Sequence, residues 1–345
     1  YPFDFNKLDI RNSRIDFYTS ESKHISVEKL NLALADLHFS HPENSGSING
    51  LKSTKGTIEL KRLSLPGLNK LDINMNVTGR NDTMDIAFSS ATHVAKSEKG
   101  KLFMDFSKKE IAYRLNYNVH DASLEHFIKQ YYKKKFMSGD IDYSIDLHSS
   151  GSDFTEVKEN LAGKIRLTGD SITLYGADID KMLKKYERSQ KFNLTDLGAI
   201  LVAGPIGLAI TKGTDFISLA TIHLDSSKRT HIRKLMASWK LKDKQLITED
   251  VAFATPLNRM AFNGQIDFAH DSIPGLTVAV IDKNGCSLMD QKLHGKFGDL
   301  KTGKLKITKT VFGSVINFVN AVVGKDCVPV YSGVVQDPLQ QTARK

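Results

Sequence analysis

Strict alternation of apolar and polar side chains is the main pattern along the chain. Between residues 111 and 120, every second position carries an apolar or aromatic side chain, namely Ile111, Tyr113, Leu115, Tyr117 and Val119. This period of two is typical of a β-strand with one buried and one solvent-facing side. The pattern therefore predicts a strand that places these five side chains on one face.

The same alternation recurs in residues 71–77, 84–88, 141–147, 165–167 and 172–174. In the later runs the apolar positions are Ile141, Tyr143, Ile145 and Leu147, then Ile165 and Leu167. Turn-forming residues at 78–82, 99–100, 149–152 and 168–171 separate these runs and predict short connections. Strands joined in this way pair antiparallel, so the fold class is mainly β. The apolar faces of 111–119 and 141–147 are expected on the same side of one sheet.

Three short helices are expected beside the strands. The first covers residues 122–136, with Asp121 as its N-cap and lysines near its C-terminal end. The second covers 153–161, and the third begins near Asp178 and continues to about residue 190. We expect them to pack at the C-terminal half of the sheet.

Residues 197–210 read LGAILVAGPIGLAI and contain no charged side chain. The segment is too short for a bilayer span, which needs roughly 20 residues, and Gly204-Pro205 interrupts a helix. We expect it to be shielded from water, either as a buried helix and turn or as a plug at a membrane interface or lipid groove. Its candidate apolar side chains are Leu197, Ile200, Leu201, Ile206 and Leu208.

Composition places the chain among globular proteins, with 345 residues, 40% hydrophobic and 25% charged. The net charge of +9 suits adsorption to an anionic phospholipid surface. Binding to nucleic acid is not expected, because the lysine runs at 133–135 and 184–185 lack interleaved aromatic residues. The chain opens at Tyr1 without a signal-peptide pattern, so we expect any membrane anchor to lie outside this sequence.

Cys286 and Cys327 are the two cysteines, and both lie at the ends of strand-like segments. We expect a disulfide between them, with two buried free thiols as the alternative. No motif for a nucleophile, a cofactor or a metal is present, so neither an enzyme nor a cofactor-binding protein is expected. The carboxylates Asp140, Asp142 and Asp146 share one strand face, which predicts a solvated surface instead of a metal site.

Several short segments occur in an order that is similar to the C-terminal region of AsmA-like proteins. The resemblance spans about residues 111–338 and includes a glycine-led strand, a helix, a second glycine-led strand and a helix start. The matching segments are Ser138-Gly139-Asp140, Gly163 and Gly169, Tyr175 to Asp180, Gly204 to Gly207, Asn284 to Leu288 and Asp326 to Gly333. Residues 8–17 resemble the family's recurring strand–turn–strand unit, although Ser13 stands where the family has glycine.

The resemblance implies a periplasmic protein, anchored to the inner membrane by an N-terminal helix absent from this chain. Such a protein bridges inner and outer membranes and carries phospholipid in a long, curved antiparallel sheet that forms an apolar groove. Its partners would be phospholipid acyl chains, membrane surfaces and outer-membrane assembly proteins. The groove lining would comprise Ile111, Tyr113, Leu115, Tyr117, Val119, Ile141, Tyr143, Ile145, Leu147, Ile165 and Leu167.

The resemblance also implies an organisation along the chain. Residues 1–120 would be a strand-rich groove segment, 121–334 a helix-containing part of the same sheet, and 335–345 a polar tail. An alternative stays open, because alternating strands also line the inside of a closed sandwich. In that case the protein would be a β-scaffold that supports outer-membrane protein assembly without carrying lipid.

Overall fold

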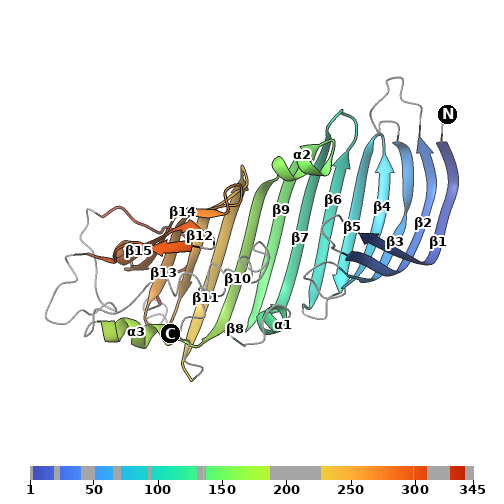
Figure 1. Ribbon diagram of the computed structural model, residues 1–345. Coiled ribbons are helices and arrows are strands. Elements are labelled where there is room, and N and C mark those ends of the chain that lie inside the picture. The colour runs from blue at the N-terminus through green and yellow to red at the C-terminus, as the bar shows by residue number, and fades with distance from the viewer. Residues whose placement is uncertain are drawn as a thin grey trace. The chain divides into compact units, whose positions relative to one another are not determined.

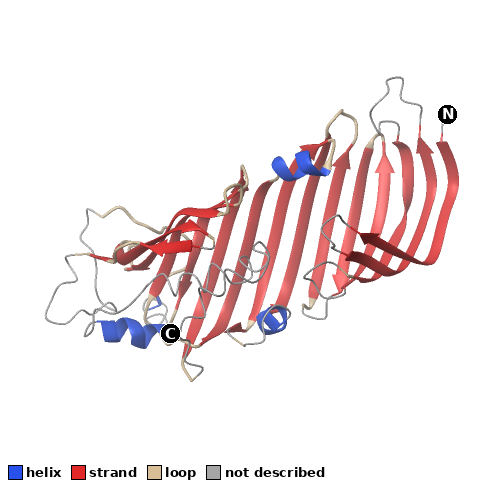
Figure 2. Cartoon of the chain, in the orientation of Figure 1, coloured by secondary structure: helices blue, strands red, loops and turns tan. Residues whose placement is uncertain are grey.

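A computed structural model describes residues 3–18, 24–39, 51–64, 71–91, 95–129, 135, 137–186, 227–297, 299–308 and 327–338. The chain divides into two compact units. Unit 1 comprises Tyr1–Ala122 and Tyr143–Lys164, and unit 2 comprises Ser123–Asp142 and Ile165–Lys345. The described residues are mainly strand with a few short helices, which confirms the predicted fold class (Figure 2).

Unit 1 is an antiparallel meander in which each strand from β1 to β7 pairs with the next one in the sequence. These strands are β1 (Phe3–Tyr18), β2 (His24–Phe39), β3 (Leu51–Leu63), β4 (Leu71–Arg80), β5 (Thr83–Ala91), β6 (Ser97–Asp105) and β7 (Ile111–Ser123) (Figure 1). Strand β9 (Asp140–Gly151) pairs with β7 and with β10 (Ala162–Tyr175). The residues of β9 and of β10 are divided between the two units.

The predicted turn at 78–82 is present but shorter. Asn81 and Asp82 both have positive φ, 48° and 58°, and they connect the directly paired residues Arg80 and Thr83. Two residues with positive φ are typical of a type I′ hairpin, whose twist matches that of the flanking strands.

Three other predicted turns are wrong, because the chain continues through each of them as strand. Residues 99 and 100 lie inside β6, 168–171 lie inside β10, and the hairpin expected at 8–17 is a single strand, β1. Asn12 and Ser171 have positive φ, 49° and 56°, which kinks a strand without reversing it. In β1, which bends along its length in Figure 1, pairing with β2 resumes after a register shift. The backbone N–H of Asn12 donates to the side chain of Asn31 at 2.8 Å.

Two of the three predicted helices have other bounds in the described residues than the sequence pattern predicts. Helix α1 (Leu124–Lys129) begins later than expected, because Asp121 lies in β7 with a φ of 52° and is not the N-cap. Helix α2 (Phe154–Glu159) is capped by Asp153, which accepts from the N–H groups of Thr155 and Glu156 at 2.8 and 2.9 Å. Helix α3 (Ile179–Tyr186) begins where predicted. The remainder of its predicted range and the apolar segment 197–210 lie outside the described residues.

Unit 2 contains a second meander, and the central strands of this meander are buried on both faces of the sheet. Its strands include β8 (Met137–Ser138), β11 (Arg229–Lys242), β12 (Gln245–Ala254), β13 (Arg259–Asp267), β14 (Ser272–Ile281), β15 (Ser287–Lys296), β16 (Asp299–Thr302) and β17 (Lys306–Ile307). Residues 251–254, 259–262 and 278–281 are consecutively buried, so both sides of β12, β13 and β14 are covered. Trp239 in β11 is only 1% exposed.

A C-terminal segment, residues 327–338, packs on the alanine-rich side of β12 to β14. Tyr331 and Val335 join a buried cluster with Ala252, Ala261 and Ala279 among its members. The Tyr331 hydroxyl donates to Asp250 at 2.5 Å, and the Arg259 guanidinium donates to the Val335 carbonyl at 2.8 Å. Burial raises the pKa of the Tyr331 hydroxyl, so it remains a donor.

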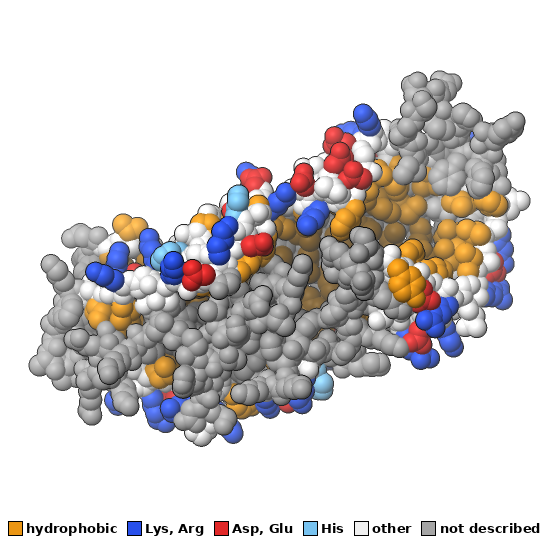
Figure 3. Space-filling model, viewed as in Figure 1, with side chains coloured by type: hydrophobic (Ala, Val, Ile, Leu, Met, Phe, Trp, Pro, Cys, Tyr) orange, Lys and Arg blue, Asp and Glu red, His pale blue; other side chains and the backbone are white. Residues whose placement is uncertain are grey.

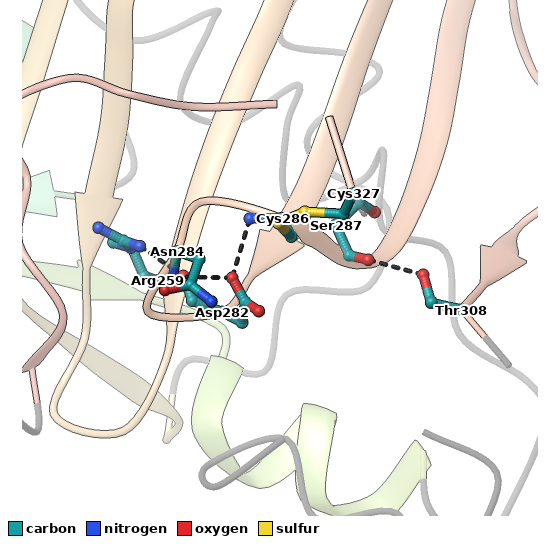
Figure 4. Close-up of a disulfide and its surroundings, with 7 residues drawn as sticks. All are labelled: Arg259, Asp282, Asn284, Cys286, Ser287, Thr308 and Cys327. Carbon is teal, nitrogen blue, oxygen red and sulfur yellow. Dashed lines mark hydrogen bonds between the residues drawn. A yellow bond between two sulfur atoms is a disulfide. The ribbon is translucent and has the colours of Figure 1, made fainter. Parts of the chain in front are cut away.

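A disulfide between Cys286 and Cys327 holds the start of this segment and confirms the predicted bridge (Figure 4). The two Cα atoms are 6.1 Å apart. Cys286 follows the turn at 282–285, where the Asp282 carboxylate accepts from the N–H groups of Asn284 and Cys286, both at 2.9 Å. The bridge thus joins the β14–β15 turn to the C-terminal segment.

Reduction of the bridge should lower the free energy of unfolding of unit 2. The sequence separation of 41 residues corresponds to a loss of about 4 kcal/mol in the chain-entropy model. Urea unfolding followed by the fluorescence of Trp239, the single tryptophan, measures the effect with and without reductant. A Cys286→Ser/Cys327→Ser variant is the control, because reductant should leave its midpoint unchanged. An unchanged midpoint in the native protein would contradict the expectation.

Candidate functional site

One face of unit 1 carries two rows of apolar residues across strands β1 to β7, with one glycine in each row. Directly paired residues form one row, which comprises Ile10, Leu32, Ile58, Met75, Phe88, Gly100 and Tyr117. The neighbouring row comprises Leu8, Leu34, Gly56, Val77, Ile86, Leu102 and Leu115. Directly opposite residues of antiparallel strands share a face with Cβ atoms about 5 Å apart. The rows therefore form one apolar stripe that crosses the strands.

The stripe continues onto β9, because the rings of Tyr117 and Tyr143 contact each other edge to face with centroids 6.0 Å apart. Ile145 and Leu147 share the face of Tyr143 by the strand period of two. The expectation that 111–119 and 141–147 face the same side is thereby met for the residues in unit 1. The other predicted lining residues, Ile141, Ile165 and Leu167, belong to unit 2.

Most side chains of this stripe are half-buried, in contrast to the core of unit 2, although Val77 is buried. Along β7, Tyr113, Leu115 and Tyr117 are partly exposed, whereas Ile111 and Val119 at the two ends of the run are buried. Helix α2 is the helix within the described part of unit 1, and none of its residues is buried. Figure 3 shows apolar side chains gathered on a hollowed side of these strands. The described residues of unit 1 thus provide a large apolar face that remains accessible in part.

Gly100 makes room for an aromatic contact within the stripe. A Cβ atom at this position would lie 2.1 Å from Cζ of Phe88, so the Phe88 ring covers the glycine. The same ring stacks on Tyr117, with centroids 5.7 Å apart and an interplanar angle of 21°. Because β6 lies between β5 and β7, a missing side chain on β6 lets the two rings meet across it.

A polar cluster that the sequence pattern did not reveal interrupts the apolar face. The Glu98 side chain faces Ser90 and Tyr117 and is only 5% exposed. Its carboxylate accepts from the Ser90 hydroxyl and from the Tyr117 hydroxyl, the latter at 3.2 Å. Burial raises the pKa of the Tyr117 hydroxyl, which keeps it protonated. A buried carboxylate is costly without such donors, so the cluster explains how Glu98 is tolerated.

The side of β9 opposite the stripe is polar. Asp140, Asp142 and Asp146 are all exposed, as expected for a solvated face. In the described part of the chain, no group of three or more His, Cys, Asp or Glu side chains could hold a metal ion. Over the same residues, no helix has both the length and the apolar character to cross a membrane. Comparisons with protein-family models, curated proteins and solved structures find no match to this chain.

Replacing Gly100 with alanine should destabilise unit 1, because the added methyl group displaces the Phe88 ring and breaks its stack on Tyr117. The expected loss is about 1–3 kcal/mol, as for other overpacked positions. Urea unfolding followed by circular dichroism measures it, and hydrogen exchange should rise in peptides from β5 to β7. Gly275→Ala is the matched control, since a Cβ atom in that strand would meet nothing within 4 Å. Equal effects of the two substitutions would contradict the proposed packing.

Proposed function

We propose that this protein binds lipid by holding acyl chains against the apolar stripe of unit 1. The observation that carries the proposal is the pair of neighbouring apolar rows that run across seven strands and remain half-exposed. Each methylene group that leaves water for such a surface contributes roughly 0.8 kcal/mol. Large exposed apolar patches on soluble proteins commonly mark binding surfaces.

The dimensions of the stripe suit hydrocarbon chains. Strands lie about 4.8 Å apart, so the six spacings between β1 and β7 give a stripe about 29 Å long. This length is close to the roughly 30 Å hydrocarbon core of a bilayer, which contains two layers of acyl chains. Leucine, isoleucine and methionine side chains dominate the two rows. Their apolar contacts with acyl chains do not require a fixed geometry, as hydrogen bonds do.

The order of segments in the second half supports membership of the AsmA-like proteins. We place this protein in the periplasm, where the Cys286–Cys327 disulfide would be maintained by the oxidising environment. In this proposal it transfers phospholipid between the inner and outer membranes and supports outer-membrane assembly. The net charge of +9 suits contact with anionic membrane surfaces. Assembly proteins of the outer membrane are the partners that fit this role.

A pair of adjacent residues on β7 tests lipid binding. Leu115 lies in the apolar stripe, whereas Asn116 points to the opposite face of the same strand. Leu115→Asp should lower the phospholipid content of the purified protein by about tenfold, because it places a charge among acyl chains. Asn116→Asp adds the same charge and should leave the content unchanged. Native mass spectrometry and lipid extraction measure the occupancy, and circular dichroism verifies that both variants fold.

The wild-type protein decides between lipid binding and the scaffold alternative. It should carry phospholipid after purification, or acquire it when incubated with phospholipid vesicles. A protein that stays free of lipid in both cases would overturn the proposal and favour a β-scaffold whose apolar face is covered by protein. Equal lipid loss in Leu115→Asp and Asn116→Asp would also count against acyl chains on the stripe.

A further inference from the structure

Two rows that differ at a single position cross strands β4 to β7 on the face opposite the apolar stripe. The paired residues Asn74, Ser89, Lys99 and Asn118 form the first row. Asn76, Ala87, Lys101 and Asn116 form the second. Each row reads asparagine, small residue, lysine, asparagine. Neighbouring positions of the two rows are two residues apart on each strand, so the rows lie about 7 Å from each other.

These eight residues line a surface depression of about 520 Å³, together with Phe88 and Gly100, which lie between the two rows along β5 and β6. The depression lies over β5 because the side chains of Ala87 and Ser89 are short, whereas the flanking strands carry the longer lysine and asparagine side chains. The lining contains no carboxylate, and neither lysine forms an ion pair within the described residues. Glu59, the partner of Asn74 on β3, accepts from the Asn31 amide at 3.1 Å. The depression is therefore positively charged and rich in amides.

The asparagines are unusual for their position. Asparagine is depleted in strands, where β-branched and aromatic residues fit better, so four of them across one depression do not serve strand stability. An amide offers two donors and one acceptor oxygen, which complements hydroxyl groups that both donate and accept. An ammonium group offers three donors and a full charge, which complements phosphate or carboxylate oxygens.

We propose that this depression binds an anionic saccharide. Its hydroxyl groups would bond to the amides of Asn74, Asn76, Asn116 and Asn118, and its phosphate or carboxylate groups to Lys99 and Lys101. The two ammonium groups emerge from positions about 7 Å apart on β6, a spacing that suits anionic groups at two points of a sugar. Nucleic acid fits less well, because the eight residues of the two rows include no aromatic ring on which a base could stack. The site is independent of lipid binding, since the two ligands would occupy opposite faces.

Isothermal titration calorimetry of the full chain at low salt tests the proposal with three probes. Fructose 1,6-bisphosphate carries both chemistries, fructose only the hydroxyls and inorganic phosphate only the anion. The bisphosphate should bind at one site per chain, at least about tenfold more tightly than either of the others, because charged and neutral hydrogen bonds add. Binding should weaken as salt is raised, since the lysines are exposed.

Matched variants distinguish binding in the depression from a non-specific effect of the protein's positive charge. Lys99→Gln/Lys101→Gln should weaken binding by about tenfold or more, because two charge-assisted bonds are lost. Lys108→Gln/Lys109→Gln removes the same charge from exposed residues after β6 and should bind as the wild type does. Ala87→Phe fills the depression without changing its charge and should likewise weaken binding by about tenfold or more. The four substituted lysines are all exposed, so their replacement should not disturb the fold. Thermal melting verifies that each variant folds.

Three results would overturn the proposal. Equal weakening in the two lysine pairs would show a general charge effect, and phosphate binding as tight as that of the bisphosphate would show an anion site without sugar recognition. The third is binding to phosphatidylglycerol vesicles that depends on Lys99 and Lys101, together with no binding of the bisphosphate. That result would assign the depression to a membrane surface.

Discussion

Cross-strand register is the constraint on which the structure of unit 1 depends. Side chains alternate between the faces of a strand, so a slip of one residue would move every apolar side chain of that strand to the polar face. The two-residue turn at Asn81 and Asp82 fixes the register between β4 and β5. The Phe88 ring reaches Tyr117 only across Gly100, and this contact holds β5, β6 and β7 in a single alignment.

The two units are built from similar antiparallel strands but differ in how far their apolar side chains are buried. Unit 2 covers both faces of β12 to β14, and the disulfide and the Tyr331 contacts fix its C-terminal segment on the sheet. Unit 1 leaves its apolar stripe half-exposed, so burial within this unit does not account for all of its apolar side chains. A ligand that covers the stripe would supply the missing burial, and this is the physical basis of the lipid proposal.

Both faces of unit 1 contain residues that a strand does not need for its own stability. On the apolar face, Glu98 is buried with two hydroxyl donors, although an apolar side chain would avoid the cost of removing a carboxylate from water. On the polar face, asparagines and lysines of two paired rows flank the short residues Ala87 and Ser89 on β5. Departures of this kind from simple strand chemistry are expected where a protein recognises a ligand.

The sequence by itself determined the mainly antiparallel β fold and the faces of β7 and β9, because these follow from local alternation. It predicted the disulfide but left two free thiols open, and the structure decided between them by bringing Cys286 and Cys327 together. The sequence did not distinguish a turn from a kink. Residues such as Asn12 and Ser171 adopt positive φ in either setting, and pairing with a distant strand decides which one forms. The burial of Glu98 and the exposure of the stripe were likewise decided by tertiary structure, since both depend on side chains that are far apart in the sequence.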